Sequence, residues 1–569
     1  MMRIREWTDR NRKKFWFCLL LNVLLLFVYL LIMRPAFDSN DDLNIALFVN
    51  LGRPVQDAHW LFPSWILGEI CAFLYRITNM VPWYGLMQYA GMLCAFTAAT
   101  WVIQRTFKSG AAILLSMIVL NFFAADAYIT MQFTKTAGVC SAAGVFLVAW
   151  VIMQEKVQIL PLTAGILITA YGFMYRHLEA DMMFALWGVF GLYLLLRLGE
   201  DAPDEKLKRA VRYIGLFALT VGVCAGCRLA DRAAYRQSPD AAYYEKINDA
   251  RSALTDYGFP KYEDNVDLFE SLDISYNAYK LFSKWNFYDP DVFTLEKMEK
   301  LIAAQNRRKA SMETLKDFLD VYPAKWFENP MFYCFLVLLV IALIHGRKEW
   351  KMWVFLALLV LVLGVLFYYM YLQGRFNLQR VDNPIWLCCS LILLYLISPR
   401  SFNLPVRYAW TFVLVILALN QNTWRENWRH NTRKQEQKRI EAANFIAGVS
   451  NDTEHLYLTK AGLYAVSAGY GPLSLVPVGA ASNMAVLGGW PAGSIPYKAS
   501  LEKYGVTNPY RDCINNDQVY LIDNDINLTL NYIREYYDMD AQAQEVRSFD
   551  GENMMYRIVS QKADADQAP

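Results

Sequence analysis

Long apolar segments separated by short basic loops are the feature that most limits how this chain can fold. A helix of about 20 apolar residues crosses a hydrocarbon layer of roughly 30 Å. The 569-residue chain is 56% hydrophobic, whereas soluble domains are roughly 45–50% apolar. We therefore expect an all-α polytopic membrane protein with about eleven transmembrane helices and additional interfacial helices. The expected spans are Phe15–Met33, Tyr84–Ile103, Gly110–Ala125, Ala137–Met153, Ile159–Tyr175, Met182–Leu196, Tyr213–Leu229, Met331–Ile344, Met352–Tyr371, Pro384–Ile397 and Tyr408–Leu419.

The basic residues predict the orientation. Residues 1–14 hold six Lys and Arg, which favours a cytoplasmic N-terminus. The shorter segment Leu61–Tyr75 carries Glu69. If this segment does not cross, every short basic loop falls on the cytoplasmic side; if it does, those loops fall outside. We therefore expect it to be re-entrant or interfacial, with a twelfth crossing as the alternative.

This assignment of loops to the two sides of the membrane divides the chain into four parts. The first is an N-terminal transmembrane module, 1–230, whose first external loop spans 34–60. An external helical insertion, 231–329, precedes the C-terminal transmembrane helices, 330–420. The rest, 421–569, interleaves strand and helix patterns and is expected to form a small external α/β domain. The net charge of +2 gives no reason to expect a nucleic-acid partner.

Ionisable residues are concentrated in the loops that this orientation places outside. Such residues at membrane depth are functional candidates by default. Asp41 and Asp42 follow the first span and open an amphipathic stretch, and we interpret them as the catalytic pair. The candidates for binding a donor phosphate are Lys135, Arg176, His177, Arg375 and Arg380. The supporting acidic and polar candidates are Asp57, His59, Asp126, Glu179 and Asp181.

Each of these candidates has a simpler structural explanation. Lys135 at the start of a span is also typical of a snorkelling anchor. Arg375 and Arg380 follow an aromatic span end and would equally serve as interface anchors. The run 176–181 would equally form a solvated turn, and His59 a hydrogen-bonded structural residue. The sequence leaves these alternatives open.

The layout around Asp41-Asp42 resembles the GT-C superfamily of polytopic membrane glycosyltransferases. The shared features are a basic N-terminus, one span, an acidic pair in the first external loop, many further spans and an external C-terminal domain. The stretches 256–260, 285–290 and 503–510 also resemble multispan proteins of Gram-positive bacteria. The layout covers about the first 420 residues. The resemblance implies that Asp41 is the base and that the pair would orient a divalent cation (Mg or Mn) if one takes part.

The resemblance implies sugar transfer from a polyprenyl phosphate or diphosphate to a glycan or protein acceptor, on the outer face of a bacterial cytoplasmic membrane. The chemistry agrees with the residues. A carboxylate takes the proton of the acceptor hydroxyl, and cations meet the charge of the departing lipid phosphate. The alternatives are a transporter or flippase of lipid-linked sugars, and a polysaccharide polymerase or ligase of similar layout.

Overall fold

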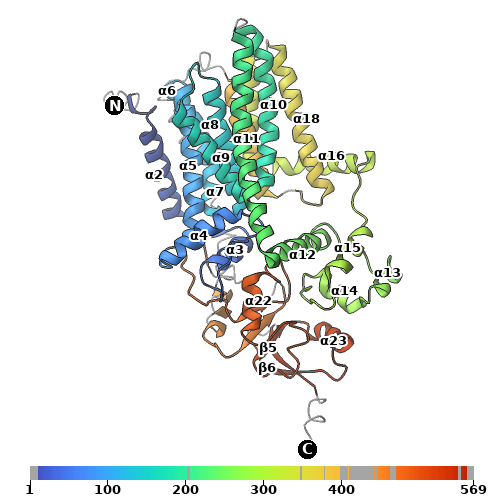
Figure 1. Ribbon diagram of the computed structural model, residues 1–569. Coiled ribbons are helices and arrows are strands. Elements are labelled where there is room, and N and C mark those ends of the chain that lie inside the picture. Colours follow the sequence, from blue (N-terminus) through green and yellow to red (C-terminus); the bar gives the residue numbers. More distant parts are fainter. Residues whose placement is uncertain are drawn as a thin grey trace, which may run out of the picture.

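The computed structural model describes residues 10–201, 205–346, 349–376, 378–397, 408, 437, 440–442, 445–446, 448–461, 470–548 and 553–560. Within these ranges the chain forms a bundle of long helices with a smaller mixed part at one end (Figure 1). The expected span Tyr408–Leu419 lies outside the described residues, except for its first residue.

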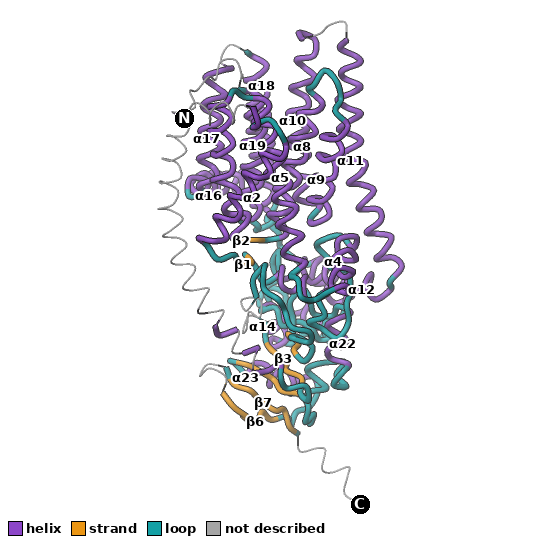
Figure 2. Tube along the Cα trace, turned by 90° about the vertical axis from the view of Figure 1, so that its left-hand side faces the viewer, coloured by secondary structure: helices purple, strands orange, loops and turns teal. Residues whose placement is uncertain are grey.

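The other ten expected spans all coincide with helices of the bundle, which Figure 2 shows from the side. Within them, α6 continues through the π-helical turn η1 into α7. The helices are α2 Phe15–Ile32, α5 Trp83–Thr106, α6 Ser109–Val119 with η1 Leu120–Ala124 and α7 Ala125–Ile129, α8 Phe133–Ile152, α9 Ile159–Tyr175, α10 His177–Asp201, α11 Lys206–Gln237, α17 Pro330–Gly346, α18 Trp350–Leu372 and α19 Gln379–Leu396.

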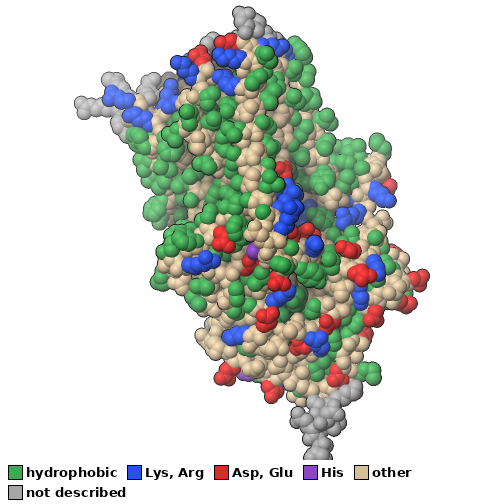
Figure 3. Space-filling view, viewed as in Figure 1, with side chains coloured by type: hydrophobic (Ala, Val, Ile, Leu, Met, Phe, Trp, Pro, Cys, Tyr) green, Lys and Arg blue, Asp and Glu red, His purple; other side chains and the backbone are tan. Residues whose placement is uncertain are grey.

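Seven of the described helices are long and apolar enough to cross a membrane. An eighth span results if α16 (Met312–Phe327) and α17, which are bent by 90° relative to each other, count as one. The shorter apolar helix α9 and the buried helix α19 complete the bundle. Hydrophobic side chains dominate the bundle surface in Figure 3. The chain is therefore a polytopic membrane protein, as the apolar pattern predicted. Helix α4 (Trp65–Ile77) has 13 residues, or about 20 Å, and is too short to cross.

Small residues bring the two central helices α8 and α9 together. A Cβ on Gly144 would lie 2.4 Å from the Thr169 side chain, and one on Gly172 would lie 2.5 Å from the Ala137 carbonyl oxygen. Helices in lipid associate through close backbone packing of this kind, because the hydrophobic effect does not drive them together there. All of α8 is buried, so it forms the axis of the bundle.

The part of the chain outside the helix bundle, named the external part for that reason, combines the insertion with the C-terminal domain. The insertion contains α12 Pro239–Thr255, α13 Val266–Ser271, α14 Tyr276–Ser283, α15 Leu295–Ala303 and α16 Met312–Phe327. The C-terminal domain has a five-stranded sheet in the order β4-β3-β5-β7-β6. Strands β4, β3 and β5 are parallel, and β7 and β6 run antiparallel. The elements are β3 Leu456–Thr459, β4 Met484–Val486, α22 Ile495–Glu502, β5 Val519–Asp523, α23 Ile526–Tyr536, β6 Gln542–Ser548 and β7 Met554–Val559.

One hydrophobic core joins the two external parts. Phe282 and Phe293 of the insertion pack in the same buried cluster as Leu458, Leu521 and Tyr532 of the sheet domain. The stretches 231–329 and 421–569 are therefore expected to fold as one unit, although the transmembrane helices α17–α19 separate them in sequence. The expected α/β character of the C-terminal region is confirmed by the sheet.

Candidate active site

A cavity of about 700 Å³ lies where the helix bundle meets the external part. Lys and Arg side chains gather beside a hollow at this junction (Figure 3). Two carboxylates, Asp41 and Asp256, face a much larger number of cations across it. The cations that line it are Arg53, Arg176, Arg251, Lys284, Arg375, Arg380 and Lys460. Such an excess of positive charge is suited to an anionic ligand.

Helix α3 (Asp41–Val49) carries Asp41 to this cavity. The short strand β1 (Ala36–Phe37) pairs in parallel with β2 (Thr130–Met131), which anchors the first loop to the connection between α7 and α8. The carboxylate then lies in the first turn of a helix, where the helix dipole stabilises negative charge.

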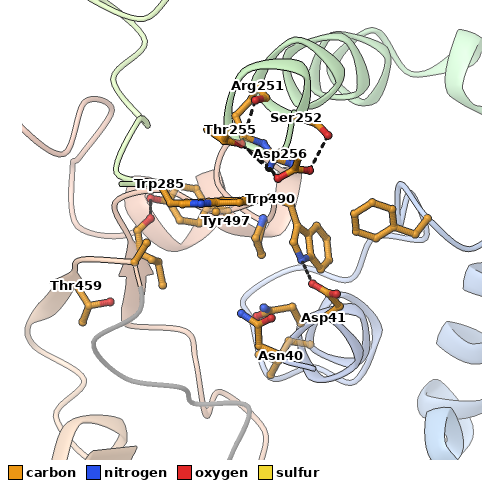
Figure 4. A pocket seen from close by; sticks show the side chains of 18 of the residues that line it. Asn40, Asp41, Arg251, Ser252, Thr255, Asp256, Trp285, Thr459, Trp490 and Tyr497 are labelled. Carbon is orange, nitrogen blue, oxygen red and sulfur yellow. Dashed lines mark hydrogen bonds and ion pairs between the residues drawn. The ribbon is translucent and has the colours of Figure 1, made fainter. Parts of the chain in front are cut away.

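Two neighbouring groups donate hydrogen bonds to the Asp41 carboxylate. The Ser39 hydroxyl donates to Oδ2 at 3.1 Å, and Nε1 of Trp490 donates to Oδ1 at 2.9 Å. Figure 4 shows the Trp490 indole pointing from the C-terminal domain toward Asp41. Trp490 stacks on Phe48 of α3 with ring centroids 5.5 Å apart. The external domain therefore holds the candidate base in a fixed orientation.

Asp42 does not line the cavity. It is fully buried, and its Oδ1 accepts three hydrogen bonds: from the Tyr84 hydroxyl at 2.8 Å, from Nε2 of Gln88 at 2.9 Å and from the Phe133 amide at 3.1 Å. Burial raises the pKa of Asp42 to about 8, although the hydrogen bonds act in the opposite direction. At neutral pH this carboxyl is therefore mainly protonated and joins α3 to α5 and α8.

Arg176, between α9 and α10, reaches the cavity from the membrane side. Its guanidinium lies 5.7 Å from the Phe62 ring centroid and 5.6 Å from that of Phe133. Burial lowers the pKa of Arg176; the charge of Glu179 raises it, and those of Arg375 and Arg380 lower it further. A cation in this position gains stability from an anion bound between these arginines.

Asp256 of the insertion forms an ion pair with Arg375, which follows α18. Its Oδ2 lies 2.6 Å from the guanidinium of Arg375, and its Oδ1 lies 3.7 Å from that of Arg251. The Ser252 hydroxyl also donates to Asp256 at 2.7 Å. By contrast, Arg380 makes no ion pair with any described residue. Of the two predicted arginines in this loop, Arg380 therefore has the guanidinium that is free to bind a ligand.

Six of the other predicted site residues form three pairs away from the cavity. Lys135 is buried and forms a 3.0 Å ion pair with Asp126, which also accepts a hydrogen bond from Asn383. The Lys135–Asp126 pair therefore links α7, α8 and α19. Lys135 is too deeply buried to act as a snorkelling anchor. The Nδ1 atom of His59 lies 2.6 Å from Asp57, and that of His177 lies 3.6 Å from Asp181. Glu179 is buried behind Arg176, at 3.9 Å.

The donor set does not suit a divalent cation. Within the described ranges, no group of three or more His, Cys, Asp or Glu side chains could hold a metal ion. Of the two suggested ligands, Asp42 is enclosed in the protein, and Asp41 faces a cavity whose cations repel a divalent ion. The mechanism proposed below therefore includes no metal ion.

Sequence reasoning did not identify the external residues that line the cavity. Arg251, Lys284, Trp285, Lys460 and Trp490 are all among them. An isolated Trp or Arg in a polar stretch belongs to no recognisable motif. Only the stretch 285–290 was noted beforehand, because it resembles other membrane proteins.

Comparisons with known proteins find two solved structures that align with most of the chain. No family model and no curated protein sequence matches it. Two solved structures of ArnT from Cupriavidus metallidurans align with 95% of this chain and 97% of theirs. The structure bound to undecaprenyl phosphate has a TM-score of 0.42 at 10% identity, and the apo structure has 0.38 at 9%. ArnT is a polytopic membrane glycosyltransferase of the GT-C family.

Proposed function

We propose that this chain is a membrane glycosyltransferase that transfers a sugar from a polyprenyl phosphate or diphosphate to an acceptor at the outer face of the bacterial cytoplasmic membrane. The observation that carries the proposal is the shared cavity: Asp41 faces Arg176 and Arg380, which come from loops far apart in the sequence. One carboxylate opposite several cations is the arrangement that this reaction requires.

In the proposed reaction the acceptor hydroxyl attacks the anomeric carbon of the donor sugar. Asp41 takes the hydroxyl proton as the new carbon–oxygen bond forms. The bond between the anomeric carbon and the phosphate oxygen breaks, and the electron pair leaves with the lipid phosphate. Arg176 and Arg380 meet the negative charge of that leaving group. A single displacement of this kind inverts the configuration of the anomeric carbon.

A paired substitution tests the role of the acidic residues. Asp41→Asn keeps the size of the side chain and removes the base, so sugar transfer is expected to fall by at least 10²-fold, the lower end of the range for general-base catalysis. Asp42→Asn is the matched control, because Asp42 is already mainly neutral and lies outside the cavity. Transfer by this variant is expected to stay within a few-fold of wild type. Equal loss in both variants would refute the assignment of Asp41 as the base.

A binding experiment tests the phosphate site separately from transfer. Undecaprenyl phosphate, a lipid product that the reaction would release, is the probe, and the purified protein is held in nanodiscs. Arg380→Gln is expected to weaken its binding by roughly tenfold or more, as for a lost charge-assisted hydrogen bond of about 1.5–3 kcal/mol. Asp41→Asn is expected to leave binding intact. If vesicles containing the protein instead moved lipid-linked sugar across the bilayer without transfer, the transporter alternative would replace this proposal.

A further inference from the structure

Trp285 has an unusual backbone conformation for a large aromatic residue. At the end of α14, the Trp285 amide donates to the Phe282 carbonyl at 3.1 Å, and the Asn286 amide donates to the Leu281 carbonyl at 3.0 Å. These two bonds form the Schellman motif that closes many helices, in which the left-handed position is usually glycine. Here Trp285 occupies it with φ of 68°, a region that bulky residues rarely adopt.

The surrounding chain holds Trp285 in this conformation. The Gly489 amide donates to its carbonyl at 3.2 Å, and the Tyr288 amide donates to the Leu487 carbonyl at 3.0 Å. A Cβ on Gly488 would lie 1.6 Å from the Trp285 carbonyl oxygen, so only glycine permits this approach. Strained residues that are fixed by their surroundings are concentrated at functional sites.

Trp285 lies on the wall of the cavity, and 36% of the residue is exposed. The Arg251 guanidinium lies 5.1 Å from its ring centroid. Figure 4 shows Trp285 nearly edge-on, with the α12 residues on one side and Asn40 and Asp41 of α3 on the other. A flat apolar surface therefore borders the space in front of the candidate base. Such a surface suits the C–H face of a sugar ring, because aromatic faces carry partial negative charge.

A cation without a partner stands beside this surface. Lys284 lines the same cavity, is exposed, and makes no ion pair with a described residue. Together with Arg251 it gives this end of the cavity a positive charge that the donor phosphate, bound near Arg176 and Arg380, does not use. Arg251 already has Asp256 as a counter-ion at 3.7 Å, so a neutral sugar would leave the charge of Lys284 unpaired.

We infer that Trp285, Lys284 and Arg251 form the acceptor subsite, and that the acceptor is a glycan whose terminal sugar ring carries a phosphate or carboxylate group. The sugar packs on the indole, which Arg251 supports, and the anionic group pairs with Lys284. The inference rests on the function proposed above and adds to it the class of the acceptor, a glycan rather than a protein.

Saccharide binding to the full chain in nanodiscs tests the inference, with saturation-transfer NMR as the readout. The probes are methyl glucoside, glucuronic acid and glucose 6-phosphate. The wild type is expected to bind the two acidic sugars several-fold more tightly than the neutral one. Trp285→Gly suits the left-handed backbone, so the fold is expected to persist while binding of all three sugars falls at least tenfold. Lys284→Gln is expected to remove the preference for acidic sugars.

Tyr276→Ala is the matched control for the aromatic ring. Tyr276 is an exposed aromatic residue on α14 that also lies beside a cation, Lys280 at 4.4 Å, but it does not line the cavity. Sugar binding by this variant is expected to equal that of wild type. Equal binding by wild type and Trp285→Gly, equal affinity for neutral and acidic sugars, or no sugar binding by the wild type would each overturn the inference.

Undecaprenyl phosphate separates this inference from the proposed function. Trp285→Gly is expected to bind that lipid as the wild type does, because the donor phosphate site uses other residues. If the wild type binds the lipid but the sugar experiments fail, the acceptor subsite alone is wrong. If the wild type does not bind the lipid, the proposed function is wrong and the inference fails with it.

Discussion

The hydrogen bond from Trp490 to Asp41 allows a sharp test of whether the external domain takes part in catalysis. Trp490→Phe removes the Nε1–H donor, which lies 2.9 Å from Oδ1, and retains an aromatic ring against Phe48. A hydrogen bond to a charged group contributes about 1.5–3 kcal/mol. Its loss leaves the carboxylate of Asp41 without one of the two hydrogen bonds that fix its orientation.

The expected result is a loss of transfer rate. A tenfold change in rate corresponds to about 1.36 kcal/mol of activation free energy. The value of kcat/KM is therefore expected to fall by about 10- to 100-fold. The measurement is the initial rate of transfer with purified protein at one fixed pH.

Trp83→Phe is the matched control. The Nε1 atom of Trp83 also donates a hydrogen bond, to the Thr78 carbonyl at 3.0 Å, but Trp83 does not line the cavity. This variant is expected to retain the wild-type kcat/KM. An unchanged kcat/KM in Trp490→Phe, or the same loss in both variants, would refute the argument that Trp490 acts on the reacting carboxylate.

Three further predictions concern stability in detergent. Gly488→Ala places a Cβ 1.6 Å from the Trp285 carbonyl oxygen, so the free energy of unfolding should fall by about 1–3 kcal/mol. The pKa of Asp42 is raised to about 8 from 3.8. The contribution of this group to stability is therefore full below about pH 4 and is lost as the pH rises through about 8. Because Asn does not titrate, the melting temperature of Asp42→Asn should rise relative to that of wild type between about pH 6 and pH 9. Lys135→Met leaves the buried carboxylate of Asp126 without its cation and should cost about 3–5 kcal/mol, part of which the added substitution Asp126→Leu should restore.

Each of these predictions has an outcome that contradicts it. Gly215→Ala is the control for the first, because a Cβ there meets nothing within 4 Å, and equal effects at the two glycines would contradict the close-approach argument. A constant difference in melting temperature between wild type and Asp42→Asn across pH would show that Asp42 does not titrate as described. If the double variant Lys135→Met with Asp126→Leu is less stable than Lys135→Met alone, the loss in Lys135→Met does not come from an unpaired Asp126 carboxylate.

Local sequence determined which segments become helices or strands. Apolar length is a property of the segment itself, so every expected span within the described residues is a helix. Strand Val519–Asp523 was equally recognisable, because alternating β-branched and aromatic residues favour an extended chain. The same reasoning identified loops rich in ionisable residues and placed Asp41 at the start of a helix, which is α3 in the structure.

Tertiary structure alone decided which ionisable residues share a site. Asp41, Arg176, Arg375 and Arg380 meet in one cavity, whereas Lys135 and most of the other candidates find partners elsewhere. The sequence could not separate these groups, because an exposed cation and a buried, paired cation have the same local pattern. The cavity wall formed by the external part was also beyond local reasoning, since residues more than 200 positions apart reach Asp41 only when the insertion and the sheet domain share one core.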